Sequence, residues 1–170
     1  TMGIVGLGRI GKAIAKRAEP FGLRIVYHGR HHQTDMPYEY YPSLVDMARA
    51  VDILMIVAPG GPQTRHMINA QILQALGADG VLINIARGSL VDEEALIEAL
   101  TKRTIRAAGL DVYANEPHVP QQLLDLDHVV LLPHIGSGSQ PTRDLMCQLV
   151  VDNVLAFGKG EAVLTPVRDA

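Results

Sequence analysis

The chain has 170 residues, of which 48% are hydrophobic and 19% are charged, and its formal net charge is −3 at pH 7. This length and composition suit one soluble globular domain with a sizeable core. The small negative charge argues against nucleic acid or an anionic membrane as a partner, and no apolar run approaches the ~20 residues of a membrane-spanning helix. The single cysteine, Cys147, permits neither an internal disulfide nor a cysteine-based metal cluster, so we expect no metal site and a reducing, cytoplasmic location.

The first stretch of the chain predicts a dinucleotide-binding turn. An apolar run over residues 2–6 leads into Gly6, Gly8 and Gly11, and a helical pattern begins at Arg9. In the spacing G-x-G-x-x-G, the first glycine permits a sharp turn, the second leaves room for a pyrophosphate, and the third lets the helix pack closely on the strand. The start of the helix would point its backbone N–H groups at the phosphates. The alternative is a tight strand-to-helix turn without a ligand.

The rest of the chain alternates short β-like runs with helical segments, which is typical of a parallel sheet with crossover helices. Further strands are expected over residues 23–27, 52–57, 80–85, 105–110 and 128–132, and residues 28–41 should form a polar loop. Helices are expected over residues 9–21, 42–50, 70–75, 92–102 and 140–157. We therefore predict an α/β fold, a Rossmann-type doubly wound parallel sheet with helices on both faces and six strands in the order 3-2-1-4-5-6.

The residues after the second strand indicate which dinucleotide binds. An NAD site usually has an acidic residue about 20 positions beyond the glycines, but here Gly29, Arg30 and two histidines occupy that place. A guanidinium can bind a 2′-phosphate through two hydrogen bonds, whereas a carboxylate would repel it. We therefore predict NADP (NADPH), with NAD as the alternative. After the 52–57 strand, Ala58, Pro59 and Thr64 belong to a turn that either follows the cofactor or is an ordinary loop.

Polar side chains follow each of the last three predicted strands. Arg87 is a cation at the end of a buried strand, which is costly unless it faces an anion such as a substrate carboxylate. Glu116 and His134 follow the next two strands, and the carboxyl ends of parallel strands meet at one edge of the sheet. A histidine held by a carboxylate is an acid–base unit, because the carboxylate fixes the imidazole tautomer. The alternatives are an exposed turn arginine and a structural histidine.

Taken together, these stretches resemble the D-isomer-specific 2-hydroxyacid dehydrogenase family, which includes glyoxylate/hydroxypyruvate reductases and 2-ketogluconate reductases. The resemblance is carried by Gly3–Gly11, Val81–Glu94, Gly109–Pro117 and Leu131–Ser137. It implies an oxidoreductase that transfers a hydride between NADP(H) and a small 2-hydroxy or 2-oxo acid such as glyoxylate, hydroxypyruvate or 2-ketogluconate.

The resemblance also assigns roles to individual residues. Arg87 would bind the substrate carboxylate and polarise the 2-oxo group, His134 would donate a proton to the carbonyl oxygen, and Glu116 would orient His134. Asp111 would help to seat the nicotinamide carboxamide. The residues expected to contact the cofactor are Gly6, Gly8, Arg9, Ile10, Gly11, Gly29, Arg30, Ala58, Pro59, Thr64, Ile85, Ala86, Arg87, Asp111, His134 and Gly136.

Members of this family are about twice as long and carry a substrate domain built mainly from an N-terminal segment that this chain lacks. We therefore expect a dinucleotide-binding domain over residues 1–138 and a C-terminal return helix and tail over residues 139–170, which would pack on that missing domain. The chain alone should then be inactive. The resemblance further implies a homodimer formed through the cofactor domain. A non-catalytic NAD(P)-sensing regulatory module of the same fold is the alternative function.

Overall fold

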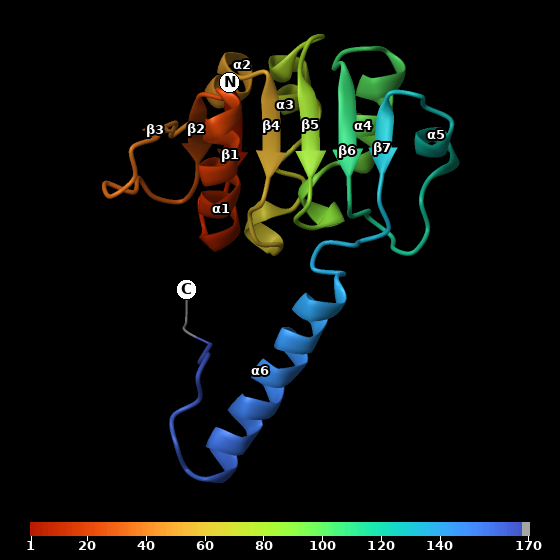
Figure 1. The fold of residues 1–170 in the computed structure, drawn as a ribbon. Helices are drawn as coiled ribbons and strands as arrows, with labels where there is room; N and C mark the ends of the chain where they lie inside the picture. The colour runs from red at the N-terminus through yellow and green to blue at the C-terminus, as the bar shows by residue number, and fades with distance from the viewer. Residues whose placement is uncertain (168–170) are drawn as a thin grey trace. The chain divides into compact units, whose positions relative to one another are not determined.

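The computed structural model describes residues 1–167, which form two compact units, residues 1–134 and the residues from Ile135 onward. The first unit is built on a seven-stranded sheet in which every pair of neighbouring strands is parallel (Figure 1). The strands are β1 (Met2–Val5), β2 (Ile25–His28), β3 (Glu39–Tyr40), β4 (Ile53–Ile56), β5 (Val81–Asn84), β6 (Ala107–Leu110) and β7 (Val129–Leu131). The predicted α/β class with a doubly wound parallel sheet is confirmed.

The strand order corrects one expectation from the sequence. The sheet runs β3-β2-β1-β4-β5-β6-β7, so the apolar strand predicted over residues 52–57 is β4 and pairs with β1 rather than lying beyond β2. The place beyond β2 belongs to β3, which lies in the stretch predicted as a loop. A strand of two residues, one of them the exposed Glu39, leaves no apolar run or alternation in the sequence.

Helices cover both faces of this sheet. In Figure 1, α1 (Arg9–Ala18) lies in front of the sheet, and α2, α3 and α4 lie behind it. The bounds of the other helices in the unit are Leu44–Ala50 for α2, Ala70–Leu76 for α3, Glu93–Thr101 for α4 and Gln121–Leu124 for α5. Short 3-10 turns span Glu19–Phe21, Pro62–Thr64 and Gly88–Leu90. Asp92 caps the start of α4, because its side chain accepts a hydrogen bond from the Ala95 N–H at 3.2 Å.

Two apolar cores lie on the two sides of the sheet. Successive strand residues point to opposite faces, so Ile4 joins the smaller core under α1 and its neighbour Val5 joins the larger core under α2, α3 and α4. Both side chains are fully buried. Burial on both faces explains why β1, β4 and β5 are almost continuously apolar and could be found from the sequence. It also fixes the carboxyl ends of these strands at one rigid edge.

The second unit is dominated by α6 (Gln140–Gly158). The tail returns along this helix, where the Asn153 side chain bonds to both the N–H and the hydroxyl of Thr165 at 3.1 and 3.0 Å. Most large apolar side chains of α6 are exposed, including Leu145, Met146, Leu149, Val150, Val154, Leu155 and Phe157. Within residues 1–167, no helix is long and apolar enough to cross a membrane.

Candidate active site

The glycine turn after β1 is tight at two positions and open at the third. Gly6 has a φ of +99°, and a Cβ there would lie 2.8 Å from the backbone of Ala58. A Cβ on Gly11 would overlap the carbonyl oxygen of Gly6, whereas a Cβ on Gly8 would meet no atom within 4 Å. Gly6 and Gly11 are therefore demanded by packing, and Gly8 leaves free space at the start of α1 where a ligand can approach the backbone.

Two adjoining cavities, together called the crevice below, run along the carboxyl ends of β1, β2, β4 and β5. They share Gly8, Ala58 and Pro59 and have volumes of ≈ 640 and ≈ 570 Å³. The first is also lined by Arg9, Ile10, Gly11, Val57, Gly60, Gly61, Ile85, Ala86, Arg87 and Ser89. The second is also lined by Val5, Gly6, Leu7, His28, Gly29, Arg30, His31, Gln33, Tyr40, Pro42, Gln63, Thr64 and Met67.

The chemistry of the crevice fits a ligand with several phosphates. None of the described residues that line it is Asp or Glu, while three are arginines, Arg9, Arg30 and Arg87. The residue that precedes α1, Gly8, provides no side-chain cap, and the first turn of the helix has no acidic residue. The positive dipole end of α1 and its first N–H groups therefore face the crevice uncompensated. A dinucleotide, with a pyrophosphate between two nucleoside halves, matches this distribution of charge and space.

The structure places the predicted cofactor residues at four different locations. All of those from Gly6 to Arg87 line the crevice. Asp111 directly follows β6 and is buried, with 5% of its surface exposed, and His134 lines a neighbouring cavity. Gly136 belongs to the second compact unit. Contact of each residue with a bound cofactor stays a prediction.

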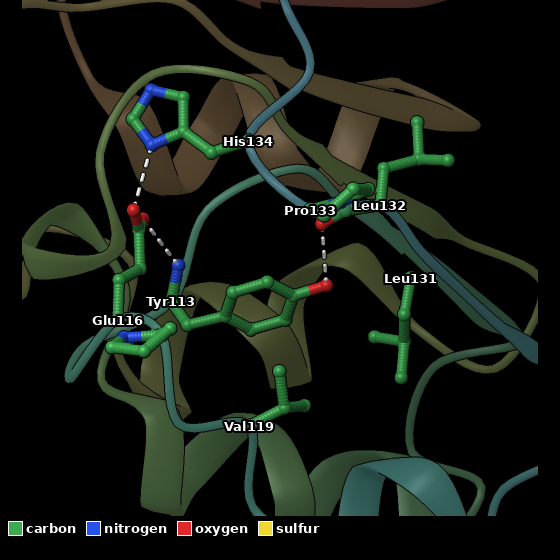
Figure 2. A pocket seen from close by; sticks show the side chains of 8 residues that line it. Tyr113, Glu116, Val119, Leu131, Leu132, Pro133 and His134 are labelled. Carbon is green, nitrogen blue, oxygen red and sulfur yellow. Dashed lines mark hydrogen bonds and ion pairs between the residues drawn. The ribbon is translucent and has the colours of Figure 1, made fainter.

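Glu116 and His134 form a hydrogen-bonded pair at the carboxyl ends of β6 and β7. Figure 2 shows the His134 Nδ1 turned toward Glu116 Oε2, 2.7 Å away, and the Tyr113 N–H donating to Glu116 Oε1 at 3.1 Å. The hydrogen bond from His134 is the main cause that lowers the pKa of Glu116. Partial burial raises this pKa, while the Tyr113 N–H and the charges of His134 and Arg87 lower it further. Glu116 is therefore ionised near neutral pH.

The ionised state of Glu116 defines the histidine tautomer. A carboxylate can only accept hydrogen bonds, so the Nδ1 of His134 must carry the hydrogen that Glu116 receives. The ring therefore turns its Nε2 away from Glu116 (Figure 2). With about 44% of the His134 side chain exposed, Nε2 can exchange a proton with a ligand. This is the arrangement expected of a general acid oriented by a carboxylate.

Arg87 belongs to a turn that is closed by buried contacts. The Asn84 side chain, in a residue that is 1% exposed, accepts from the Ala86 N–H and donates to the Arg87 carbonyl, both at 3.0 Å. The Arg87 guanidinium donates to the Ala86 carbonyl at 2.6 Å. Next to Arg87, a Cβ on Gly88 would overlap the Tyr113 carbonyl group. The turn that carries Arg87 is thus packed directly against the segment that leads to Glu116.

Sequence reasoning missed Asn84, Gly88 and Tyr113, all of which support the three predicted side chains. Asn84 left a signal, because it is a polar residue that ends an otherwise apolar buried strand. Gly88 and Tyr113 left none, since their importance depends on contact between two segments about 25 positions apart.

A third cavity of ≈ 300 Å³ lies beside the Glu116–His134 pair. Its lining is largely apolar and consists of Tyr113, Glu116, Pro117, Val119, Leu131, Leu132, Pro133 and His134 (Figure 2). The Tyr113 hydroxyl donates to the Leu132 carbonyl at 2.8 Å, and burial is the main cause that raises the pKa of this phenol. Tyr113 is therefore neutral near pH 7 and acts as a donor. The described residues contain no group of three or more His, Cys, Asp or Glu arranged to hold a metal ion.

The parallel sheet, the glycine turn under α1 and the anion-compatible crevice define a Rossmann-type dinucleotide-binding domain, here with an acid–base pair at the neighbouring strand ends. The model of the D-isomer specific 2-hydroxyacid dehydrogenase, NAD binding domain, matches residues 1–136. The chain belongs to this family, which confirms the resemblance inferred from its motifs.

Individual relatives support the same assignment. The chain is 53% identical over 167 residues to a glyoxylate/hydroxypyruvate reductase of Arabidopsis thaliana, covering 98% of this chain and 53% of that protein. It is 43% identical to a 2-ketogluconate reductase of Gluconobacter oxydans, with 98% and 54% covered. The crystal structure of an NADPH-dependent glyoxylate/hydroxypyruvate reductase from Sinorhizobium meliloti, in complex with NADP and malonate, superposes with a TM-score of 0.97 at 50% identity, covering 100% of this chain and 55% of that one. The chain thus spans about half the length of these relatives.

Proposed function

We propose that this chain is the cofactor-binding part of an NADP-dependent reductase of small 2-oxo acids, of the glyoxylate, hydroxypyruvate or 2-ketogluconate type. The observation that carries the proposal is the Glu116–His134 pair, joined at 2.7 Å, at the same edge of the sheet as the crevice. The names of the relatives support it, because they are reductases of these acids. A domain that only senses a dinucleotide would have no need for a proton donor held in a defined tautomer.

The chemistry of the reaction matches the residues at this edge. Reduction of a 2-oxo acid adds a hydride to the carbonyl carbon and a proton to the carbonyl oxygen, and a bound NADPH would supply the hydride. His134, protonated at Nε2, would give the proton, while Glu116 holds Nδ1–H and stabilises the positive ring before transfer. Arg87 would bind the substrate carboxylate through its planar fork and withdraw charge from the carbonyl.

Cofactor preference follows from the far end of the crevice. Arg30 and His31 line the cavity beyond β2, where no described lining residue is acidic. The guanidinium of Arg30 is exposed and free to pair with a 2′-phosphate. We therefore assign NADPH as the preferred reductant over NADH, in agreement with the NADP bound in the Sinorhizobium meliloti relative.

The proposal extends to the arrangement of the whole protein. We propose that residues 1–138 bind the cofactor and that residues 139–170 pack on a substrate domain outside this chain, which would cover the exposed apolar side chains of α6. We also propose a cytoplasmic homodimer formed through the cofactor domains. Light scattering of the full-length protein tests the dimer, and a monomer at micromolar concentration would contradict it.

Turnover by the full-length protein tests the function. Glyoxylate, hydroxypyruvate and 2-ketogluconate are each supplied with NADPH, and oxidation of the cofactor is followed by its absorbance. We expect oxidation with at least one acid, a loss of about 10²-fold or more in His134→Gln, and unchanged activity in the control His118→Gln, an exposed histidine outside the cavities described. Tight NADPH binding with no oxidation of any acid would overturn the proposal and favour the sensing module.

A further inference from the structure

Tyr113 contacts the segments that carry all three candidate catalytic side chains. Its backbone N–H donates to Glu116 Oε1 at 3.1 Å. Its hydroxyl donates to the carbonyl of Leu132, two residues before His134, at 2.8 Å. Its own carbonyl group packs against Gly88, the neighbour of Arg87, so closely that no side chain fits between them. One residue that is 7% exposed thus touches the turns that carry Arg87, Glu116 and His134.

We propose that Tyr113 is a positioning residue for the reaction: its N–H fixes the Glu116 carboxylate, and its hydroxyl fixes the segment that carries His134 opposite that carboxylate. This inference rests on the proposed function of the site. Tyr113 touches neither the proton that is transferred nor the carbonyl that receives it. It acts through the geometry of the pair.

The backbone at His134 explains why such support is needed. His134 has a φ of +52°, a left-handed conformation that a residue with a Cβ adopts only where its surroundings impose it. Strand β7 ends at Leu131, so the sheet itself does not hold this residue. Pro133, directly before it, has no N–H to donate.

Leu132 is the last residue before His134 that is held at both ends. Its N–H donates to the Leu110 carbonyl at 2.8 Å, and its carbonyl accepts from the Tyr113 hydroxyl. Without that hydroxyl, the Leu132 carbonyl would face the apolar cavity in Figure 2 without its phenol donor. Leu132 would then be held only through its N–H, so the segment that leads from its carbonyl to His134 would be less restrained and the His134 ring less closely aimed at Glu116.

The variant Tyr113→Phe removes only the hydroxyl and keeps the ring that fills the cavity wall. In the full-length protein we expect kcat to fall by about fivefold or more, as for the loss of one buried hydrogen bond, while KM for the 2-oxo acid stays within about twofold. The acidic limb of the kcat/KM profile should move to higher pH. A looser His134 contact lets the pKa of Glu116 return toward its ordinary value, because the His134 hydrogen bond is what chiefly lowers it.

A second measurement reports the pair without turnover. In protein labelled with nitrogen-15 at histidine, we expect a sharp, low-field Nδ1–H proton signal from His134 in the wild type and a broadened or lost signal in Tyr113→Phe. The control is Tyr41→Phe, which removes a phenol hydroxyl from a half-buried tyrosine in the core on the α2 side of the sheet. It should leave kcat, the pH profile and the His134 signal unchanged.

The results separate this inference from the function on which it rests. An inactive wild type would overturn the proposed function, and the His134 signal would still test the positioning. An active wild type with unchanged kcat and pH profile in Tyr113→Phe would overturn the inference. A lower kcat with an unchanged pH limb and an unchanged His134 signal would also overturn it, since the hydroxyl would then support only the fold.

Discussion

Gly88 lies where the Arg87 turn packs against the segment that leads from Tyr113 to Glu116. The variant Gly88→Ala tests whether the spacing between these two segments matters. An added Cβ would lie 2.5 Å from the Ala114 nitrogen and would overlap the Tyr113 carbonyl group. Unbonded atoms prefer separations of about 3.5 Å, and the added Cβ would lie 2.0 Å from the Tyr113 carbonyl carbon. The Arg87 turn and the segment leading to Glu116 must therefore move apart by roughly 1.5 Å. Both partners are backbone, and no flexible side chain can absorb the strain.

The size of the effect follows from this displacement. Overpacking of a closed contact costs about 1–3 kcal/mol of unfolding free energy, and a misplacement of about 1 Å between reacting groups can lower the rate by about 10²-fold. We therefore expect kcat/KM for 2-oxo acid reduction to fall by about 10²-fold. The dissociation constant of NADPH should rise by much less, because only one side of the crevice moves.

The assay compares Gly88→Ala with Gly109→Ala in the full-length protein. Gly109 lies on strand β6, and a Cβ there would lie 3.9 Å from the Ile83 side chain, which is an ordinary contact. Urea unfolding measures stability, steady-state kinetics measures kcat/KM, and fluorescence titration measures NADPH affinity. If Gly88→Ala keeps the kcat/KM of the wild type, the spacing between the Arg87 turn and the Tyr113 segment is irrelevant to catalysis and the reasoning fails.

Three further variants test other parts of the site. Arg30→Ala should weaken NADPH binding by roughly ten- to a hundredfold and leave NADH binding within about twofold, because only the 2′-phosphate loses a charged partner; an unchanged NADPH/NADH ratio, equal to that of the control Arg49→Ala on α2, refutes the assignment. Asn84→Ala leaves the Ala86 N–H and the Arg87 carbonyl without their side-chain partner, so unfolding free energy should fall by about 1–3 kcal/mol and KM for the acid should rise more than the Kd of NADPH; equal changes in both would contradict a specific effect on Arg87. Glu116 has a pKa lowered in the folded state, so its contribution to stability is present above the ordinary glutamate pKa and is lost as the pH falls through the lowered value. In urea titrations at decreasing pH, Glu116→Gln should therefore lose less unfolding free energy than the wild type. If its unfolding free energy falls with pH as steeply as that of the wild type or of the control Glu161→Gln, the stabilising interaction between Glu116 and His134 is refuted.

The sequence predicted those parts of the molecule that depend on local pattern. The apolar runs of β1, β4 and β5 are visible because these strands are buried on both faces. The G-x-G-x-x-G spacing marks positions where packing forbids a side chain at Gly6 and Gly11. The two-residue strand β3 was missed, since it has no periodicity of its own and exists only through its pairing with β2.

The three candidate catalytic residues could also be predicted from the sequence, but the residues that hold them in place could not. Arg87, Glu116 and His134 could be chosen because each follows a strand, and topology brings such residues to one edge. Their supports could not be chosen in this way. Tyr113 has the pattern of an ordinary core aromatic residue, and its value lies in a hydroxyl that meets a carbonyl 19 positions later in the chain. Contacts of this kind are set by the packing of turns and leave no spacing in the sequence.

A second histidine–carboxylate pair in the same chain shows that topology, more than the pair itself, defines the site. His128 Nδ1 lies 3.2 Å from Asp127 Oδ1, but its Nε2 is also bonded, to the Leu100 carbonyl at 3.2 Å. Because His128 precedes β7 and His134 follows it, the Asp127–His128 pair lies at the amino ends of the parallel strands and the Glu116–His134 pair lies at their carboxyl ends. Only the pair at the carboxyl edge adjoins the side of the sheet where the crevice opens. A proton donor needs both a partner that fixes one nitrogen and a neighbouring site that can use the other, and only His134 combines the two.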